Sequence, residues 1–212
     1  MDTQIVLIFC LCDDLLKALH HVEDKQCQLS DAEIMTAAIV AMLYYRGNFR
    51  VACQFLCEYG YMPQMLSRSR FNRRLHRIAD LFLTLFLSLG EYWKVLNERS
   101  SYILDSYPIA ACDNYRIPRC KLYQGKAWRG YIASKKRFFY GVRIHILITE
   151  SGQPVEFFLA PGAMSDTAAL SRYDLDVPDG SWLTGDKAYN DYTIEDVLRE
   201  AGVELLPMRK HN

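Results

Sequence analysis

The chain has 212 residues, of which 50% are hydrophobic, so it is long enough to bury a sizeable core. Its 25 basic and 25 acidic side chains cancel, and bulk charge therefore gives no argument for a nucleic-acid partner. Seven cysteines without a C-x-x-C pair, and without histidines at zinc-ligand spacing, favour neither a disulfide framework nor a zinc module.

The apolar run near the N-terminus, Ile5 to Cys12, is too short to span a bilayer and is followed by Asp13 and Asp14. No basic segment precedes it, as a secretory signal would require. Because the cysteines are also typical of reduced thiols, we expect a cytoplasmic protein without a membrane partner.

Helical periodicity runs through the first hundred residues. In SDAEIMTAAIVAMLYY, Ser30 and Glu33 have capping-box spacing and predict a helix start. A second helix is expected over FRVACQFLCEY, ending at Gly60. A longer helix is predicted over residues 69–96, because apolar residues recur there every three or four positions. We therefore expect a helical domain over residues 1–100.

The first turns of this longer helix carry four arginines, offset from the apolar stripe. No acid precedes Asp80 on the same stretch, and guanidinium groups this close repel one another unless an anion lies alongside. One interpretation is an ordinary solvated helix face, and the other is a surface that binds DNA phosphate. The second interpretation would make residues 1–100 a helical DNA-binding domain. Its candidate DNA-binding residues are Arg70, Arg73, Arg74 and Arg77.

After Ser100 the pattern changes from helical to strand-like. YILDSYPI predicts a strand with one acid inside it, and FFYGVRIHILITESGQPVEFFLAPG alternates around an ESGQP turn as a hairpin does. SDTAALSRY, SWLTGDKAY, DYTIEDVLREAG and VELLPMR then predict helix, strand, helix and strand. This order predicts an α/β domain with a mixed sheet over residues 101–212.

Charge is unevenly distributed within this second part. From Tyr115 to Thr149 there are nine Lys/Arg and no acid, interleaved with aromatic residues. Such a composition is typical of surfaces where phosphates are neutralised and unpaired bases stack. Part of the block must be structural, because Phe138 to Tyr140 begin a predicted strand. The candidate DNA contacts are Lys121, Lys126, Arg129, Lys135, Lys136 and Arg137.

Two aspartates lie within or at the end of apolar strand candidates, where a carboxylate loses hydration. Asp105 lies in YILDSYPI and Asp186 follows SWLTG. Each alone is compatible with an acid that faces water or caps a turn. Two on one small sheet would raise each other's pKa unless a cation such as Mg²⁺ lies between them. Asp113, Asp166 and His145 are explained more simply, as a turn residue, a helix N-cap and a core histidine.

Three long stretches make the sequence similar to a known family: YILDSYPIAACDNYRI, the run from YQGKAWRGY to SDTAAL, and LTGDKAYNDYTIEDVLREAGVELLPMRKHN. They resemble the catalytic region of DDE-type transposases of bacterial insertion sequences, and LSRSRFNRRLHRI resembles the N-terminal part of such enzymes. The resemblance implies a ribonuclease H-like mixed sheet in which three acids hold two Mg²⁺ ions, for which Mn²⁺ substitutes. Asp105 and Asp186 match the first two acids, as catalytic and metal-binding residues.

The third acid of the family is a glutamate on a later helix. We expect the chain to stop at Asn212 before that helix, as a C-terminally truncated enzyme with an incomplete catalytic domain. Gly185, just before the second acid, would leave room for metal or phosphate. Lys187 would offset DNA charge, or would simply be a solvated lysine.

The function implied by the resemblance is metal-dependent cleavage at transposon ends and strand transfer into target DNA. The expected partners are the terminal repeats, the target DNA and further copies of the chain, since two ends must be brought together in a homodimer or larger assembly. One alternative is a catalytically inactive remnant that only binds transposon ends. Another is a nuclease of the same fold.

Overall fold

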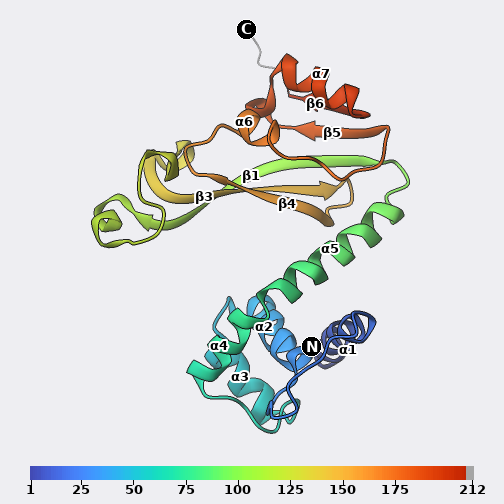
Figure 1. Cartoon of the computed structure of the whole chain (residues 1–212), viewed down its shortest axis with the longest axis vertical. Helices are drawn as coiled ribbons and strands as arrows, with labels where there is room; N and C mark the ends of the chain where they lie inside the picture. Colours follow the sequence, from blue (N-terminus) through green and yellow to red (C-terminus); the bar gives the residue numbers. More distant parts are fainter. Residues whose placement is uncertain (209–212) are drawn as a thin grey trace. The chain divides into compact units, whose positions relative to one another are not determined.

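The chain divides into two compact units, Met1–Phe86 and Leu87–Asn212. The computed structural model describes residues 1–208 apart from the side chains of Asp113, Asn114 and Ser134, so the side chain of Asp113 lies outside the described residues. Figure 1 shows the helical elements in blue to green and the sheet in green to red. The boundary between the units falls inside a helix, whereas residue 100 marks the end of helical periodicity. In the described part of the chain, no helix combines the length and apolarity needed to cross a membrane.

The N-terminal unit is helical, as predicted. Ser30 starts the second helix through the expected capping box: its hydroxyl accepts from Glu33 N (3.1 Å), and the Glu33 carboxylate accepts from Ser30 N (2.6 Å). Ile34 and Met35 of this helix are fully buried, so it is packed on several sides. The helices are α1 (Asp2–Ala18), α2 (Asp31–Tyr45), α3 (Phe49–Glu58), α4 (Arg68–Arg77) and α5 (Ala79–Leu96), the last of which continues into the second unit.

The single long helix expected over residues 69–96 is wrong, because the structure has two helices there. The backbone leaves helical geometry at Ile78 (φ −101°, ψ 18°), and α5 begins at the next residue. Leu81 N donates to Ile78 O (3.0 Å), which makes a tight turn between the two helices. Ile78 is itself buried, so the apolar spacing continues through the break. No glycine or proline marks this position, so the apolar periodicity could not predict the break between the two helices.

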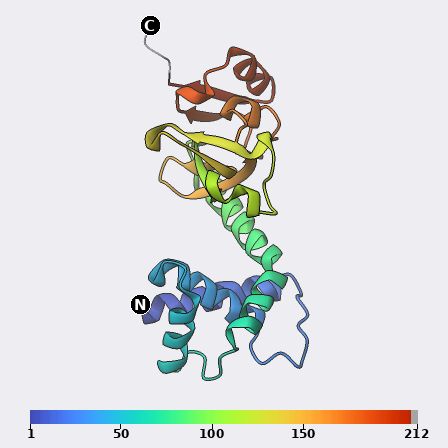
Figure 2. The ribbon, with the colours of Figure 1, turned by 90° about the vertical axis from the view of Figure 1, so that its left-hand side faces the viewer.

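The second unit is built on a six-stranded mixed sheet (Figure 1; turned by 90° in Figure 2). Its central strand β1 pairs antiparallel with β3 and parallel with β5, and β5 pairs parallel with β6. The far edge of β3 pairs with both β2 and β4. The order β4-β3-β1-β5-β6 is the ribonuclease H-like mixed sheet that was predicted. The strands are β1 (Ser101–Asp113), β2 (Arg129–Ile132), β3 (Arg137–Thr149), β4 (Pro154–Pro161), β5 (Ser181–Gly185) and β6 (Val203–Pro207).

The two faces of this sheet differ in burial. Leu104, Leu147 and Leu183 are almost fully buried on one face, which helices α6 (Asp166–Leu170) and α7 (Tyr192–Glu200) cover. On the opposite face, Ile103 is 38% exposed and Trp182 is 52% exposed. Successive strand residues point to opposite faces, so a residue between two core positions lies on this open face.

Candidate active site

Asp105 and Asp186 follow register partners on two neighbouring strands. β1 and β5 run parallel, and Leu104 is paired with Gly185. The next residue on each strand is an aspartate, and the backbone is still extended at Asp186 (φ −72°, ψ −178°). Alternation therefore places both aspartates on the open face, opposite the buried Leu104 and Gly185. Because paired strands lie about 4.8 Å apart, the backbones at the two aspartates are neighbours at this end of the sheet.

One oxygen of each carboxylate is held by the backbone. Ser106 N donates to Asp105 Oδ1 (2.7 Å), and Ala188 N donates to Asp186 Oδ1 (2.8 Å). Both side chains are exposed, and no basic side chain of residues 1–208 makes a described ion pair with either. The arrangement thus offers fixed, solvent-facing carboxylate oxygens, which are the hard ligands that Mg²⁺ prefers.

Gly185 does not leave room for metal or phosphate, and that expectation is wrong. The glycine is buried, and a Cβ added to it would lie 3.0 Å from Tyr189 Cδ2. Strand alternation is the reason, because it turns the residue before Asp186 towards the core. The small residue instead admits the ring of Tyr189, which belongs to the 3-10 helix η4 (Lys187–Tyr189) that Asp186 caps.

A buried polar network lies beneath the two acids. His145 is fully buried, its Nδ1 is 2.8 Å from the Tyr189 hydroxyl, and its ring stacks on Phe158, with the ring centroids 4.5 Å apart.

Burial lowers the pKa of His145 despite the charge of Asp166, so the imidazole is neutral near pH 7. Burial also raises the pKa of Tyr189, and the negative charges of Asp166, Asp186 and Asp105 add to that effect. A core role for His145 was predicted, but nothing in the sequence marked Tyr189 as its partner.

Asp166 belongs to this network and is not the N-cap of α6. Ser165 has that role, because its hydroxyl accepts from Ala168 N (3.3 Å). Asp166 follows it, is 9% exposed, and lies 3.5 Å from Arg143 Nη1 and 3.9 Å from His145 Nε2. The sequence interpretation was wrong by one residue, since both serine and aspartate are good caps and only the backbone shows which one precedes the helix.

The four arginines of α4 are not equivalent. Arg74 Nη2 contacts Asp31 Oδ1 at 2.5 Å and donates to Leu29 O at 3.0 Å, and its side chain is only 11% exposed. The guanidinium of Arg74 is therefore held inside the helical unit, whereas the sequence predicted that it would contact DNA. The other three, Arg70, Arg73 and Arg77, are exposed. All four arginines line a hollow of about 430 Å³ together with residues 26–28 and Leu66.

One side-chain group of the helical unit has metal-ligand spacing. The ligand atoms of His21, Glu23 and Asp31 lie within 4.8 Å of one another. However, Asp31 already accepts from His21 Nε2 at 2.9 Å and from Arg74, and Glu23 accepts from Asp31 N at 2.9 Å. Burial alone would raise the pKa of Asp31, but these hydrogen bonds and the two basic groups lower it overall. The adjacent guanidinium already provides the positive charge that a cation would bring.

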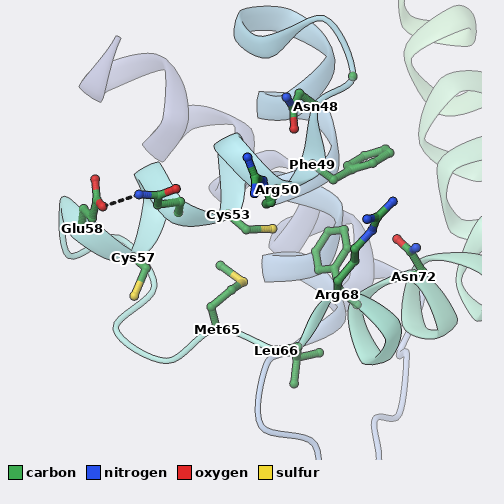
Figure 3. A pocket seen from close by; sticks show the side chains of 13 residues that line it. Asn48, Phe49, Arg50, Cys53, Cys57, Glu58, Met65, Leu66, Arg68 and Asn72 are labelled. Carbon is green, nitrogen blue, oxygen red and sulfur yellow. Dashed lines mark hydrogen bonds between the residues drawn. The ribbon is translucent and has the colours of Figure 1, made fainter.

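A cavity of about 740 Å³ lies between α3 and α4 (Figure 3). Its lining is mainly apolar and sulfur-bearing, with Cys53 and Met65 pointing into it. Glu58 at one end is held by Gln54 (2.7 Å). Glu58 is the one acid in this lining, so the cavity offers no pair of carboxylates for a metal ion and is not the candidate active site.

The basic block forms the long connection from β1 to β3 and the first residues of β3. It contains the short 3-10 helices η1 (Asn114–Arg119), η2 (Lys126–Trp128) and η3 (Ala133–Lys135), with β2 between the last two. Figure 1 shows this segment extending beyond the end of the sheet. All the predicted DNA contacts in this unit are exposed, namely Lys121, Lys126, Arg129, Lys135, Lys136, Arg137 and Lys187.

Comparison with known proteins identifies one family. The family model described as "Transposase DDE domain" matches residues 97–212, which is more than half of the chain and includes both aspartates. No curated protein matches the chain.

Two solved structures show weaker similarity. A piggyBac transposase synaptic complex with hairpin DNA is 12% identical, with a TM-score of 0.41, and the match covers 100% of this chain and 42% of that one. A Mos1 transposase paired-end complex with left transposon end is also 12% identical, with a TM-score of 0.27, covering 89% of this chain and 61% of that one. The chain therefore spans less than two thirds of the length of either.

Proposed function

Because the chain belongs to the transposase DDE domain family through residues 97–212, we propose that it cleaves DNA at transposon ends and joins the ends to target DNA. The observation that carries the proposal is the pairing of Leu104 with Gly185, which brings Asp105 and Asp186 together on the open face of the sheet. Family membership supports the reaction class, and the register supports the choice of these two aspartates as its residues.

Asp105 and Asp186 would hold divalent metal, with Mg²⁺ as the physiological ion and Mn²⁺ as a substitute. Their exposed oxygens and fixed backbone contacts fit hard cations. Bound metal in such a site activates an attacking oxygen and stabilises the leaving one during in-line displacement at phosphorus. The chain's own contribution is to keep both carboxylates aligned, through the Ser106 and Ala188 amides and the strand pairing.

DNA would be held by two separate basic surfaces. In the helical unit, Arg70, Arg73 and Arg77 are exposed and make no ion pair with an acid among residues 1–208, so they are suited to phosphate. In the sheet unit the exposed basic side chains of residues 121–137 and Lys187 would contact the strand that is cut. Each phosphate contact should contribute to the salt dependence of binding by nearly one unit of slope.

Terminal-repeat DNA and target DNA are the proposed partners, with two or more copies of the chain on DNA because two ends must meet. The third acid of the family is assigned to none of the described residues. Asp191 caps α7 through Thr193 N (2.9 Å), and Asp196 pairs with Arg199 (2.9 Å). The exposed basic residues of both units need no metal to contact DNA, and they favour, as a second candidate, a form that binds transposon ends without cutting them.

A cleavage assay tests the proposal. The chain is incubated with duplexes carrying the ends of its element and with random duplexes, in Mg²⁺, in Mn²⁺ and in EDTA. Metal-dependent nicking confined to the element ends is the expected result. Binding of the ends without nicking would support the inactive form, and equal cutting of random DNA or RNA would replace transposition with a general nuclease.

A further inference from the structure

The strand β2 and the start of β3 form a two-stranded ribbon, residues 129–140, whose inner face is tightly packed. Gly130 is paired with Phe139, which is fully buried. A Cβ on Gly130 would lie 2.5 Å from Phe139 Cε1, so only glycine fits against this ring. The base of the ribbon is joined to the loop after β4, because Ala163 N donates to Ala127 O (3.1 Å). The ribbon therefore presents its outer face in a defined orientation.

The outer face carries an exposed group of two aromatic rings and a cation. Tyr131 and Phe138 are cross-strand partners with ring centroids 4.9 Å apart, and they are 46% and 41% exposed. The guanidinium carbon of Arg129 lies 4.0 Å from the centroid of the Phe138 ring. We call Arg129, Tyr131 and Phe138 the aromatic platform.

The charge around the platform restricts what it can bind. Lys135 and Lys136 lie at the turn between the two strands and are exposed, and the stretch from Tyr115 to Thr149 contains no acid. A cationic surface with partly exposed aromatic rings is complementary to a ligand that has both negative charge and flat aromatic groups. A DNA strand has both in each nucleotide. An apolar protein surface would leave these cations without partners.

The rings distinguish unpaired from paired DNA. Inside a duplex each base is stacked on its neighbours, so its faces are not available to a protein side chain, whereas an unpaired base offers a free face. We propose that the aromatic platform stacks unpaired bases of DNA while the neighbouring lysines contact the phosphates of the same strand. This inference rests on the proposed function for the source of such a strand, namely DNA opened at a transposon end.

Binding measurements with three probes test the inference. Fluorescence anisotropy is recorded for the full chain with a labelled thymidine strand of about 12 nucleotides, an abasic strand of equal length, and a duplex. The thymidine strand should bind more tightly than the abasic strand, which has the same phosphates. Phe138→Ala should weaken thymidine binding about 5- to 140-fold, because stacking on one base is typically worth about 1 to 3 kcal/mol. Duplex binding should change less than about two-fold.

Matched variants separate stacking from folding. Tyr131→Phe keeps a ring and should retain thymidine binding, whereas Tyr131→Ala should lose it. Tyr92→Ala removes a ring that is 57% exposed on α5, away from the basic block, and should have no effect. Equal binding of thymidine and abasic strands would overturn the inference. A loss shared equally by single strand and duplex would also overturn it.

Photocrosslinking gives an independent readout. A strand carrying 5-iododeoxyuridine should crosslink to the peptide that contains Tyr131 or Phe138, and crosslinking elsewhere alone would contradict the inference. None of these assays needs metal or cleavage. A chain that binds unpaired bases but cuts no DNA would therefore refute the proposed function alone, and a chain that cuts transposon ends without base-dependent binding would refute the platform alone.

Discussion

Acids of the two units are used in different ways. Asp31 of the helical unit is buried, and its carboxylate contacts both Arg74 and His21. Asp105 and Asp186 of the sheet unit are exposed, and in the part of the chain that the structure describes they receive hydrogen bonds from backbone amides alone. Removing one partner of a buried ion pair is costly, so the carboxylate of Asp31 is needed inside the fold, whereas exposed carboxylates remain accessible to a ligand.

The same distinction applies to basic residues within one helix. Arg74 and Arg73 are adjacent in α4, but Arg74 is directed to Asp31 and Arg73 is exposed. Composition therefore does not indicate which of the two is accessible to DNA. The tertiary partner of each arginine decides which one is accessible. A substitution then distinguishes a charged or polar group that stabilises the fold from one that binds a ligand.

The largest effect is expected from Asp105→Asn. Asparagine keeps the shape and the contact with Ser106 N but loses the negative charge, so metal should no longer be held. Metal-dependent cleavage should fall by more than about 100-fold, because even changes to the partners of metal ligands cost roughly 10- to 100-fold. Single-turnover cleavage and calorimetric titration with Mn²⁺ measure the two consequences.

Glu204→Gln is the matched control for this change. Glu204 is exposed and lies on the same open face, but it pairs with Trp182 at the other end of the parallel strands. Its neutralisation should leave cleavage and Mn²⁺ binding unchanged. Equal Mn²⁺ affinity in wild type and Asp105→Asn would remove Asp105 from the metal site.

Asp31→Asn should destabilise the helical unit by about 3 kcal/mol, since it leaves the guanidinium of Arg74 buried without its carboxylate. The effect should stay near the lower end for a broken buried pair, because Arg74 keeps its bond to Leu29 O. Urea unfolding followed by far-ultraviolet circular dichroism measures it. Unchanged stability would show that the pair contributes little to the fold.

Tyr189→Phe should cost the sheet unit about 1 to 2 kcal/mol, because the buried Nδ1 of His145 would lose its partner at 2.8 Å. The exposed Tyr92, changed to phenylalanine, provides the control and should have no measurable effect. Chemical unfolding monitored at the sheet unit distinguishes the two variants. A neutral result for Tyr189→Phe would mean that another group satisfies the imidazole.

Acidification should weaken the sheet unit through His145. The pKa of His145 is lowered in the folded protein, chiefly by burial, whereas a histidine in the unfolded chain has a pKa of about 6.5. Below that pH the unfolded chain binds a proton that the folded chain does not accept, so stability falls as the pH falls towards the folded pKa. Unfolding measured between about pH 7 and pH 5 tests this, and a His145→Asn variant that still folds should lose this part of the dependence.

The smallest effect is expected from Arg73→Ala. Loss of one phosphate contact should reduce the slope of log K against log salt by about 0.9 and change the free energy of unfolding by less than about 0.5 kcal/mol. Arg74→Ala should do the reverse, with an unchanged slope and a destabilised helical unit. Equal slopes for wild type and Arg73→Ala would assign Arg73 to the solvated surface.

Much of the architecture was predictable from local patterns. The Ser30–Glu33 capping box, the hairpin of β3 and β4, and the alternation of strands and helices after residue 150 all appear in the structure. Each depends on residues close together in the sequence, where spacing and turn chemistry suffice. The break at Ile78 was not predictable, because the apolar spacing continues through it.

The sequence by itself determined the order of the elements, the placement of one acid on each of two strands and the concentration of basic and aromatic residues between them. Only the tertiary structure decided that Leu104 pairs with Gly185, that Tyr189 fills the space beside the glycine, and that Asp31 binds Arg74 rather than leaving it for DNA. Periodicity depends on neighbours along the chain, whereas register and ion pairing depend on residues far apart in sequence that folding brings together.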